Sequence, residues 1–462
     1  MSVVERQGTA PVGRLLLQYS LPAVAGFVTN ALYQLVDRIL VGRGVGTEAM
    51  AAVTCAYPLT LLSMGVGLLL GTGTGTQVST LLGQGRTADA ERVLGQSVRL
   101  GLVLGGALAA AYLVLARPLL RLCGAEGPVL DSAIPYLRIS AAGQLCLVAI
   151  ISMGNILRVQ GRPGLGLAFM AGGNALNAAL AAWAIFGLHL GVAGAAAATT
   201  LSVALNLAAI LLFVQGPRSI LHIHRRHLRA DRALARSIVS LGAPIFLMQV
   251  LAMATFLAAN QGAAALDGTR GVAAVGVFNT VAILLIYPLV GIAQAMQPLV
   301  SFNRGAGRPD RVRAFLGHVL LTTSVLGCAF AAAVAVAPGP VAGLFTKSDI
   351  GLVELVRRGL PFTMASVALF GVQGTAAHYF LAMERPRPAA LLLLGRQLLA
   401  IPLFLVLPRL LGFLGLYLVG LLSDLPFAMV AAAQLKAEWG QLRLPEKQRA
   451  AVQTGAGLAA GG

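Results

Sequence analysis

The sequence predicts an all-α polytopic membrane protein in which twelve transmembrane helices form two parallel six-helix repeats. Three observations support this prediction: the composition, twelve apolar runs long enough to cross a bilayer, and an internal repeat. Charged residues make up 11% of the 462 residues, hydrophobic residues make up 57%, and the mean hydropathy is +0.82. A soluble domain carries about 25% charged residues, so a soluble enzyme is excluded, and the apolar content equally excludes intrinsic disorder.

The excess of basic residues is explained by a location in the membrane. There are 34 Lys and Arg against 16 Asp and Glu, a net charge of +18. Loop Lys and Arg fix topology and meet anionic lipid, and no basic face interleaved with aromatic residues predicts nucleic-acid binding. The four cysteines are scattered without a CxxC pair, so neither a disulfide framework nor a metal site is expected. No HExxH or GxSxG motif predicts an enzyme or a cofactor.

Twelve apolar runs of about 20 residues mark the expected spans, each bounded by Arg, Pro or Gly clusters. They lie at about 15–41, 49–80, 95–116, 134–157, 164–188, 191–214, 238–264, 272–302, 315–337, 354–381, 389–411 and 413–434. Within the second run Gly67, Gly71 and Gly75 recur every four residues, which predicts close packing against another helix.

Loop charges set the orientation. With a cytoplasmic N-terminus, 23 of the 34 Lys and Arg residues fall on the inner side and 10 on the outer side. This bias predicts that both termini are cytoplasmic. We expect a multi-pass protein of the plasma (inner) membrane that acts as a monomer, with the lipid bilayer and small-molecule substrates as its partners.

The second half of the chain repeats the first half in a constant register. Gly83-Gln84-Gly85-Arg86 recurs as Gly305-Ala306-Gly307-Arg308, and Ala51-Ala52-Val53 recurs at the same offset as Ala273-Ala274-Val275. Six spans per repeat is an even number, so the halves are parallel and related by an axis along the membrane normal. The predicted organisation is an N-terminal lobe at 1–214, a basic cytoplasmic linker at 215–236, a C-terminal lobe at 237–435 and a cytoplasmic tail at 436–462.

An acid within a membrane span is a candidate functional residue because its burial is expensive. Asp37 lies in the first span, and Asn30, Tyr33 and Gln34 share a broad helix face with it. Alternatively, Asp37 sits at the outer end of the span and pairs with neighbouring Arg38.

Amides and hydroxyls recur in the fifth and sixth spans at a similar expected depth. Asn174 and Asn177 lie in the fifth span, and Thr199 and Asn206 share one face of the sixth. We expect these residues to reach a cavity shared with Asp37, and hydrogen bonding between helices alone is the alternative.

The second lobe carries a different pair of charges. Arg396 and Asp424 fall at similar depths in the last two spans. A buried pair costs less than either charge alone, so we expect a structural ion pair, or alternatively a substrate or gating contact. The position that repeats Asp37 is Ala259, so the two lobes differ in chemistry.

These residues resemble the multidrug and toxic compound extrusion (MATE) family, in its bacterial form. The resemblance covers roughly residues 12–435 and rests on five groups of residues: Asn30, Tyr33, Asp37, Val41-Gly42 and Gly46; Asn155, Arg158, Gly161 and Pro163; Gly173-Asn174 and Asn177; Gly191 to Ala196 with Ala198-Thr199; and Gln297-Pro298, Asn303 and Gly305-Ala306.

The resemblance implies two six-helix lobes around a V-shaped cleft and export of organic cations driven by inward H+ or Na+. It ties Asp37, Asn177 and Thr199 to cation coupling, and we expect Asn30, Tyr33, Gln34, Asn174 and Asn206 to line the substrate cavity. Many members carry Asp-Pro four residues after the span-5 asparagine, where this chain has Ala181-Ala182. A single titrating Asp favours H+ over Na+.

The sequence therefore predicts a secondary active multidrug efflux transporter that exports amphipathic, cationic small molecules by antiport. A flippase or exporter of lipid-linked saccharides in the same superfamily is one alternative, although it favours a strongly basic cleft. A major-facilitator transporter is another alternative, because it shares the architecture of two six-helix repeats. Its loop motif has an Asp at the position where this chain has Thr87, which argues against it.

The topology is testable by cysteine labelling on a Cys-free background in intact cells. An impermeant reagent should fail to label a cysteine placed at Arg225 and should label one placed at His189, because the charge bias puts these loops on opposite sides. Labelling at position 225 from outside would show that the orientation is the opposite of the one predicted.

Overall fold

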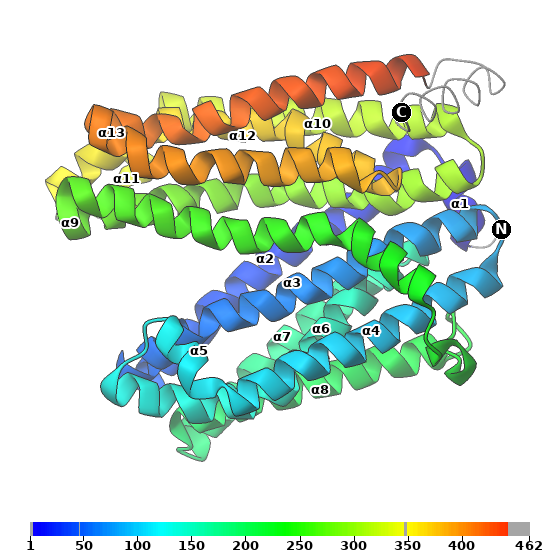
Figure 1. The fold of residues 1–462 in the computed structure, drawn as a ribbon, viewed down its shortest axis with the longest axis horizontal. Helices are drawn as coiled ribbons and strands as arrows, with labels where there is room; N and C mark the ends of the chain where they lie inside the picture. Colours follow the sequence, from blue (N-terminus) through cyan, green and yellow to red (C-terminus); the bar gives the residue numbers. More distant parts are fainter. Residues whose placement is uncertain (1–2, 46, 346–348, 442–462) are drawn as a thin grey trace.

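The computed structural model describes residues 3–45, 47–345 and 349–441. Over these residues the chain is helical, without a strand, and it forms two lobes that lie side by side (Figure 1). The long helices of the N-terminal lobe are α2 (Val12–Gly44), α3 (Thr47–Gly83), α4 (Thr87–Val114), α6 (Gly127–Val159), α7 (Pro163–Ala182) and α8 (Gly191–Gln215). Those of the C-terminal lobe are α9 (Arg232–Gly305), α10 (Pro309–Val336), α12 (Ile350–Ala382) and α13 (Pro386–Gln441).

Ten helices in the described part of the chain are long and apolar enough to cross a membrane. Two of them, α9 and α13, contain breaks and each supplies two crossings. The backbone leaves helical geometry at Asp267-Gly268 and at Gly412, and the two glycines have φ values of 48° and 61°, which glycine adopts without steric cost. The twelve expected spans are thus confirmed.

Four short helices were not predicted: α1 (Val3–Thr9), α5 (Ala116–Leu122), α11 (Pro338–Gly343) and the 3₁₀ turn η2 (Arg225–Leu228). Helices this short give no apolar signal of the length that a bilayer needs, so the search for spans passes over them. Both α5 and α11 follow the third crossing of their lobe, and their first residues are related by the same offset as Gly83 and Gly305. They therefore follow the same repeat as the sequence.

Helix α3 has two glycine-rich faces. Gly67, Gly71 and Gly75 face α6, where an added Cβ would meet Ile151 or Asn155. This is the close packing expected from their spacing. The other face, with Gly65 and Gly73, lies against α9 of the opposite lobe.

The lobes meet backbone to backbone along the second half of α3. A Cβ on Gly73 would collide with the carbonyl of Ile238, and one on Gly242 with the carbonyl of Leu69. Ser79 donates a hydrogen bond to the Pro298 carbonyl at 2.7 Å. From this contact the helices of the two lobes diverge toward the end that carries α5 and α11 (Figure 1).

The repeat symmetry appears in this contact. A Cβ on Gly83 would strike the Phe302 carbonyl, and one on Gly305 would strike the Thr80 carbonyl. Thr80 and Phe302 are one repeat apart, as are Gly83 and Gly305, so the two contacts are images of each other. The pseudo-two-fold axis therefore passes between the lobes at this point.

The N-terminal segment bridges both lobes at the same end. The Gln7 amide donates to the carbonyl of Val159 at 2.9 Å, and Asn303 donates back to the carbonyl of Gln7 at 3.1 Å. Arg311 donates to the carbonyl of Ala10 at 2.6 Å. These bonds tie α6 of one lobe to α9 and α10 of the other.

The linker between the lobes is held to the N-terminal lobe. The ring nitrogens of His222 and His224 lie 3.6 and 3.2 Å from carboxylate oxygens of Glu91, and the His222 backbone amide donates to the same carboxylate at 3.0 Å. Asp231 then caps α9 by accepting hydrogen bonds from the backbone amides of Ala233 and Leu234, which is the usual way to begin a helix. Of the predicted tail, residues 442–462 lie outside the described residues.

The lobe contact predicts that Gly242→Ala weakens closure at this end. The clash with a backbone carbonyl costs about 1–3 kcal/mol, more than the roughly 1 kcal/mol that Ala gains over Gly in a helix. Spin labels at Ala88 and Asp310 should report a larger separation between the lobes. Gly276→Ala is the matched control, because a Cβ there meets nothing within 4 Å. Equal distances in the two variants would contradict the steric argument.

Candidate functional site

The N-terminal lobe gathers polar side chains from three helices around Asp37. Tyr33, one turn before Asp37 on α2, lies within reach of Thr199 of α8. Tyr33 and Tyr136, the latter from α6, both lie close enough to Asp37 for electrostatic interaction. Asp37, Tyr33 and Thr199 are half-buried. The structure thus brings together two of the three residues expected to couple cations.

Asn177 joins this group indirectly. Its side chain is only 3% exposed, and its amide donates to the hydroxyl of Ser202 at 2.9 Å. Ser202 in turn donates to the carbonyl of Thr199 at 2.9 Å. The Asn177 side-chain oxygen is buried and has no hydrogen-bond partner among the described residues. Such a group is costly to leave unpaired, so it is available to water or an ion.

The residues expected to line a substrate cavity have varied surroundings. Gln34 accepts a hydrogen bond from Tyr57 at 3.4 Å. Asn206 packs against Gly173, where an added Cβ would meet its amide nitrogen. The Asn174 amide nitrogen is buried without a partner among the described residues, and Asn30 is half-buried. The alternative pairing of Asp37 with Arg38 involves a side chain outside the described part.

In the C-terminal lobe Arg396 and Asp424 lie in contact. Arg396 Nε lies 2.8 Å from Asp424 Oδ1, and the side chains are 28% and 4% exposed. The contact is an ion pair without hydrogen-bond geometry, since neither atom has a hydrogen-bond partner among the described residues. Asp424 depends on Arg396 for charge compensation, whereas the Arg396 side chain is the less buried of the two.

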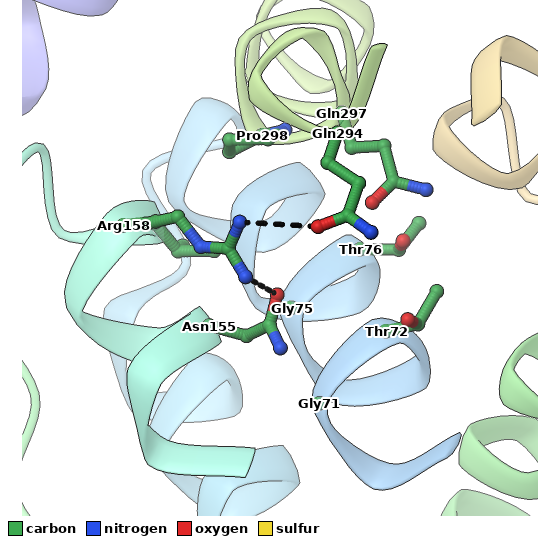
Figure 2. Close-up of a pocket in the computed structure, with 10 residues that line it drawn as sticks. Gly71, Thr72, Gly75, Thr76, Asn155, Arg158, Gln294, Gln297 and Pro298 are labelled. Atoms are coloured by element: carbon green, nitrogen blue, oxygen red, sulfur yellow. Dashed lines mark hydrogen bonds between the residues drawn. The ribbon is translucent and has the colours of Figure 1, made fainter. Parts of the chain in front are cut away.

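A cavity lies where α3, α6 and α9 meet between the lobes (Figure 2). Arg158 is at its centre and donates to Asn155 at 2.7 Å and to Gln294 at 3.5 Å. The full lining is Gly71, Thr72, Gly75, Thr76, Asn155, Arg158, Val159, Gln294, Gln297 and Pro298.

Sequence reasoning missed several residues of these sites. Tyr57 and Tyr136 are single tyrosines in apolar runs, and no spacing relates them to Asp37. Arg158 and Gln297 belong to matched motifs, but nothing in the sequence shows that the two motifs meet. Arg158 directly follows the expected fourth span at 134–157, so it looked like an ordinary residue of an inner loop.

Two six-helix repeats that carry polar side chains between their helices are the architecture of a membrane transporter. Comparison with known sequences identifies the family. The MatE family matches residues 22–183 and residues 244–406. The chain belongs to this family. The starts of the two matched segments are related by the same offset as Gly83 and Gly305, so the family match follows the internal repeat.

Curated relatives include the multidrug export protein MepA of Staphylococcus haemolyticus strain JCSC1435. It is 25% identical over 421 residues, which cover 90% of this chain and 92% of that protein. MepA of Staphylococcus aureus strain NCTC 8325 is also 25% identical, over 425 residues that cover 91% and 93% of the two chains.

Solved structures share the fold. A multidrug resistance MATE family transporter of the MOP superfamily in an outward-facing conformation matches with a TM-score of 0.88 at 23% identity, over 96% of this chain and 99% of that one. A MATE structure in the bent conformation matches with a TM-score of 0.89 at 24% identity, over 97% and 99%.

The ion pair predicts unequal effects of its two single substitutions. Arg396→Met leaves Asp424 buried without a partner and should destabilise the protein by about 3–5 kcal/mol. Asp424→Leu should cost less, because the Arg396 side chain is less buried than that of Asp424 and its long stem can turn toward a more polar environment. The double variant should be more stable than Arg396→Met alone. Thermal unfolding in detergent measures all three, and additive losses would mean that the two residues act separately.

Proposed function

We propose that this chain is a secondary active multidrug efflux transporter that exports amphipathic, cationic small molecules by antiport with H+. The observation that carries the proposal is the carboxylate of Asp37, set within a membrane-crossing helix near Tyr33 and Tyr136, with Thr199 on the far side of Tyr33. Membership of the MatE family and the names of the MepA relatives support the export of drugs. No covalent step is needed, so the protein is proposed not to be an enzyme.

Antiport requires that proton and substrate favour opposite states of the protein. A ligand shifts a conformational balance only by binding the two states differently. Asp37 attracts a cationic substrate when it is ionised and loses that attraction when it is protonated. Protonation also changes the interaction of Asp37 with Tyr33 of α2 and Tyr136 of α6. Because Tyr33 in turn interacts with Thr199 of α8, protonation can be linked to a rearrangement of these helices.

The oxygen ligands near Asp37 favour a proton over Na+. A hard cation prefers several oxygen ligands, with charge among them. Asn177, Thr199 and Tyr33 offer neutral oxygens, but the position where many family members carry a second carboxylate is Ala181, which is fully buried. One titrating carboxylate is sufficient for proton coupling.

The direction of transport follows from the closed end of the molecule. The loops after α3 and after α9 lie at the end where the lobes meet and the N-terminal segment bridges them. The positive-inside rule assigns this basic end to the cytoplasm. We therefore propose a plasma (inner) membrane location with both termini inside, and an outward-facing state in which protons enter and substrate leaves.

Asp37→Asn tests the proposal. The amide cannot release a proton at neutral pH, so export driven by a pH gradient should fall to background in liposomes. Asn177→Ala and Thr199→Ala should reduce export less, because they only support the carboxylate. The readout is efflux of a fluorescent organic cation with and without an imposed gradient, in protein shown to be folded by its thermal unfolding.

Asp310→Asn is the matched control. It removes an exposed acid at the start of α10, far along the chain from the α2 site, and should leave export unchanged. Wild-type export by Asp37→Asn would eliminate this mechanism and move proton coupling to the C-terminal lobe.

A further inference from the structure

The cavity between the lobes contains a positive charge that the described protein does not balance. Arg158 lies one residue before the end of α6, where the lobes meet, and both of its hydrogen-bond acceptors, Asn155 and Gln294, are neutral amide oxygens. No carboxylate in the described ranges lies within ion-pair distance of the guanidinium. The Arg158 side chain is half-buried, and a partly desolvated cation without a counter-charge is costly.

Unused hydrogen-bond donors surround the same space. Gln294 accepts from Arg158 through its oxygen, which leaves its amide nitrogen as a donor. The Gln297 nitrogen is buried without a partner among the described residues. The hydroxyls of Thr72 and Thr76 complete the polar lining. A site rich in donors and poor in negative charge is suited to an anion, not a cation.

The charge is also specific to one lobe. At the repeat offset of 222 the counterpart of Arg158 is Phe380, and at an offset of 223 it is Leu381. Both are buried apolar residues. By contrast, Thr72 and Gln294 are one repeat apart and both line the cavity. The cavity therefore lies across the pseudo-two-fold axis but carries its positive charge on the N-terminal side alone.

We propose that this cavity binds a small inorganic anion of about the size of chloride. The volume open to the centre of a water-sized sphere is about 10 Å³, so the cavity is small. A monatomic halide needs less of this space than a carboxylate or phosphate group, which brings several oxygen atoms. Arg158 supplies the charge, and the free amide donors of the α9 glutamines supply contacts from the other lobe.

The anion has a conformational consequence because its contacts come from both lobes. Arg158 belongs to α6, whereas Gln294 and Gln297 belong to α9. Separation of the lobes at this end would divide the site, so the anion binds more tightly to the state in which they are in contact. By linkage, the bound anion stabilises that closed contact.

Bromide provides a direct probe of the site. In crystals of the wild-type protein grown or soaked in bromide, anomalous diffraction should show a peak in contact with the Arg158 guanidinium. Arg158→Gln should abolish the peak, and Arg162→Gln, four residues away and outside the cavity lining, should retain it. A wild-type cavity that holds only an ordered water at saturating bromide would overturn the proposal.

Spin-label distances test the consequence in solution. With labels at Ala88 and Asp310, replacing chloride with gluconate should lower the ratio of closed to open molecules in the wild-type protein. Arg158→Gln should remove this dependence on halide. Arg158→Lys should retain it with affinity weakened roughly tenfold, because a charge remains but the forked donors are lost. A distance distribution in the wild-type protein that is the same in chloride and gluconate would refute the linkage.

Discussion

The approach of α3 to helices on both of its sides is the constraint on which the rest of the structure depends. Gly67, Gly71 and Gly75 let α6 pack closely on one face, and Gly65 and Gly73 let α9 of the other lobe approach on the opposite face. Without hydrophobic driving force inside a bilayer, helices associate through such close packing and hydrogen bonds. One helix is thus part of its own lobe and of the contact between lobes.

This arrangement separates the polar chemistry into three places. The α2, α6 and α8 helices hold an acid among hydroxyls, α13 holds a balanced ion pair, and the junction of α3, α6 and α9 holds a guanidinium among amides. The repeat duplicates the scaffold but not these side chains. Architecture and chemistry have therefore diverged independently: backbone contacts such as Gly83 with Phe302 keep the symmetry, whereas Asp37 and Arg158 break it.

Much of the fold was predictable because membrane helices leave a strong signal. Twelve apolar runs, the break at Gly412 and the constant register between the two halves each follow from hydropathy or direct repetition. The contact between Arg396 and Asp424 was also expected, since two buried charges at equal depth on consecutive spans gain by pairing. The helices α1, α5 and α11 were missed because they are too short for a periodicity signal.

The remaining features depend on which helices are neighbours, and a single sequence does not contain that information. Tyr136 of α6 comes near Asp37 of α2 because α6 packs against α8. Ser202 connects Asn177 to Thr199 only at the observed rotation of α7 against α8. The glycine spacing on α3 predicts close packing but not which face meets which lobe. The same ambiguity hid the cavity at Arg158. Its lining combines two distant motifs, and they meet only because the narrow glycine faces of α3 bring α6 and α9 to the same level of one helix.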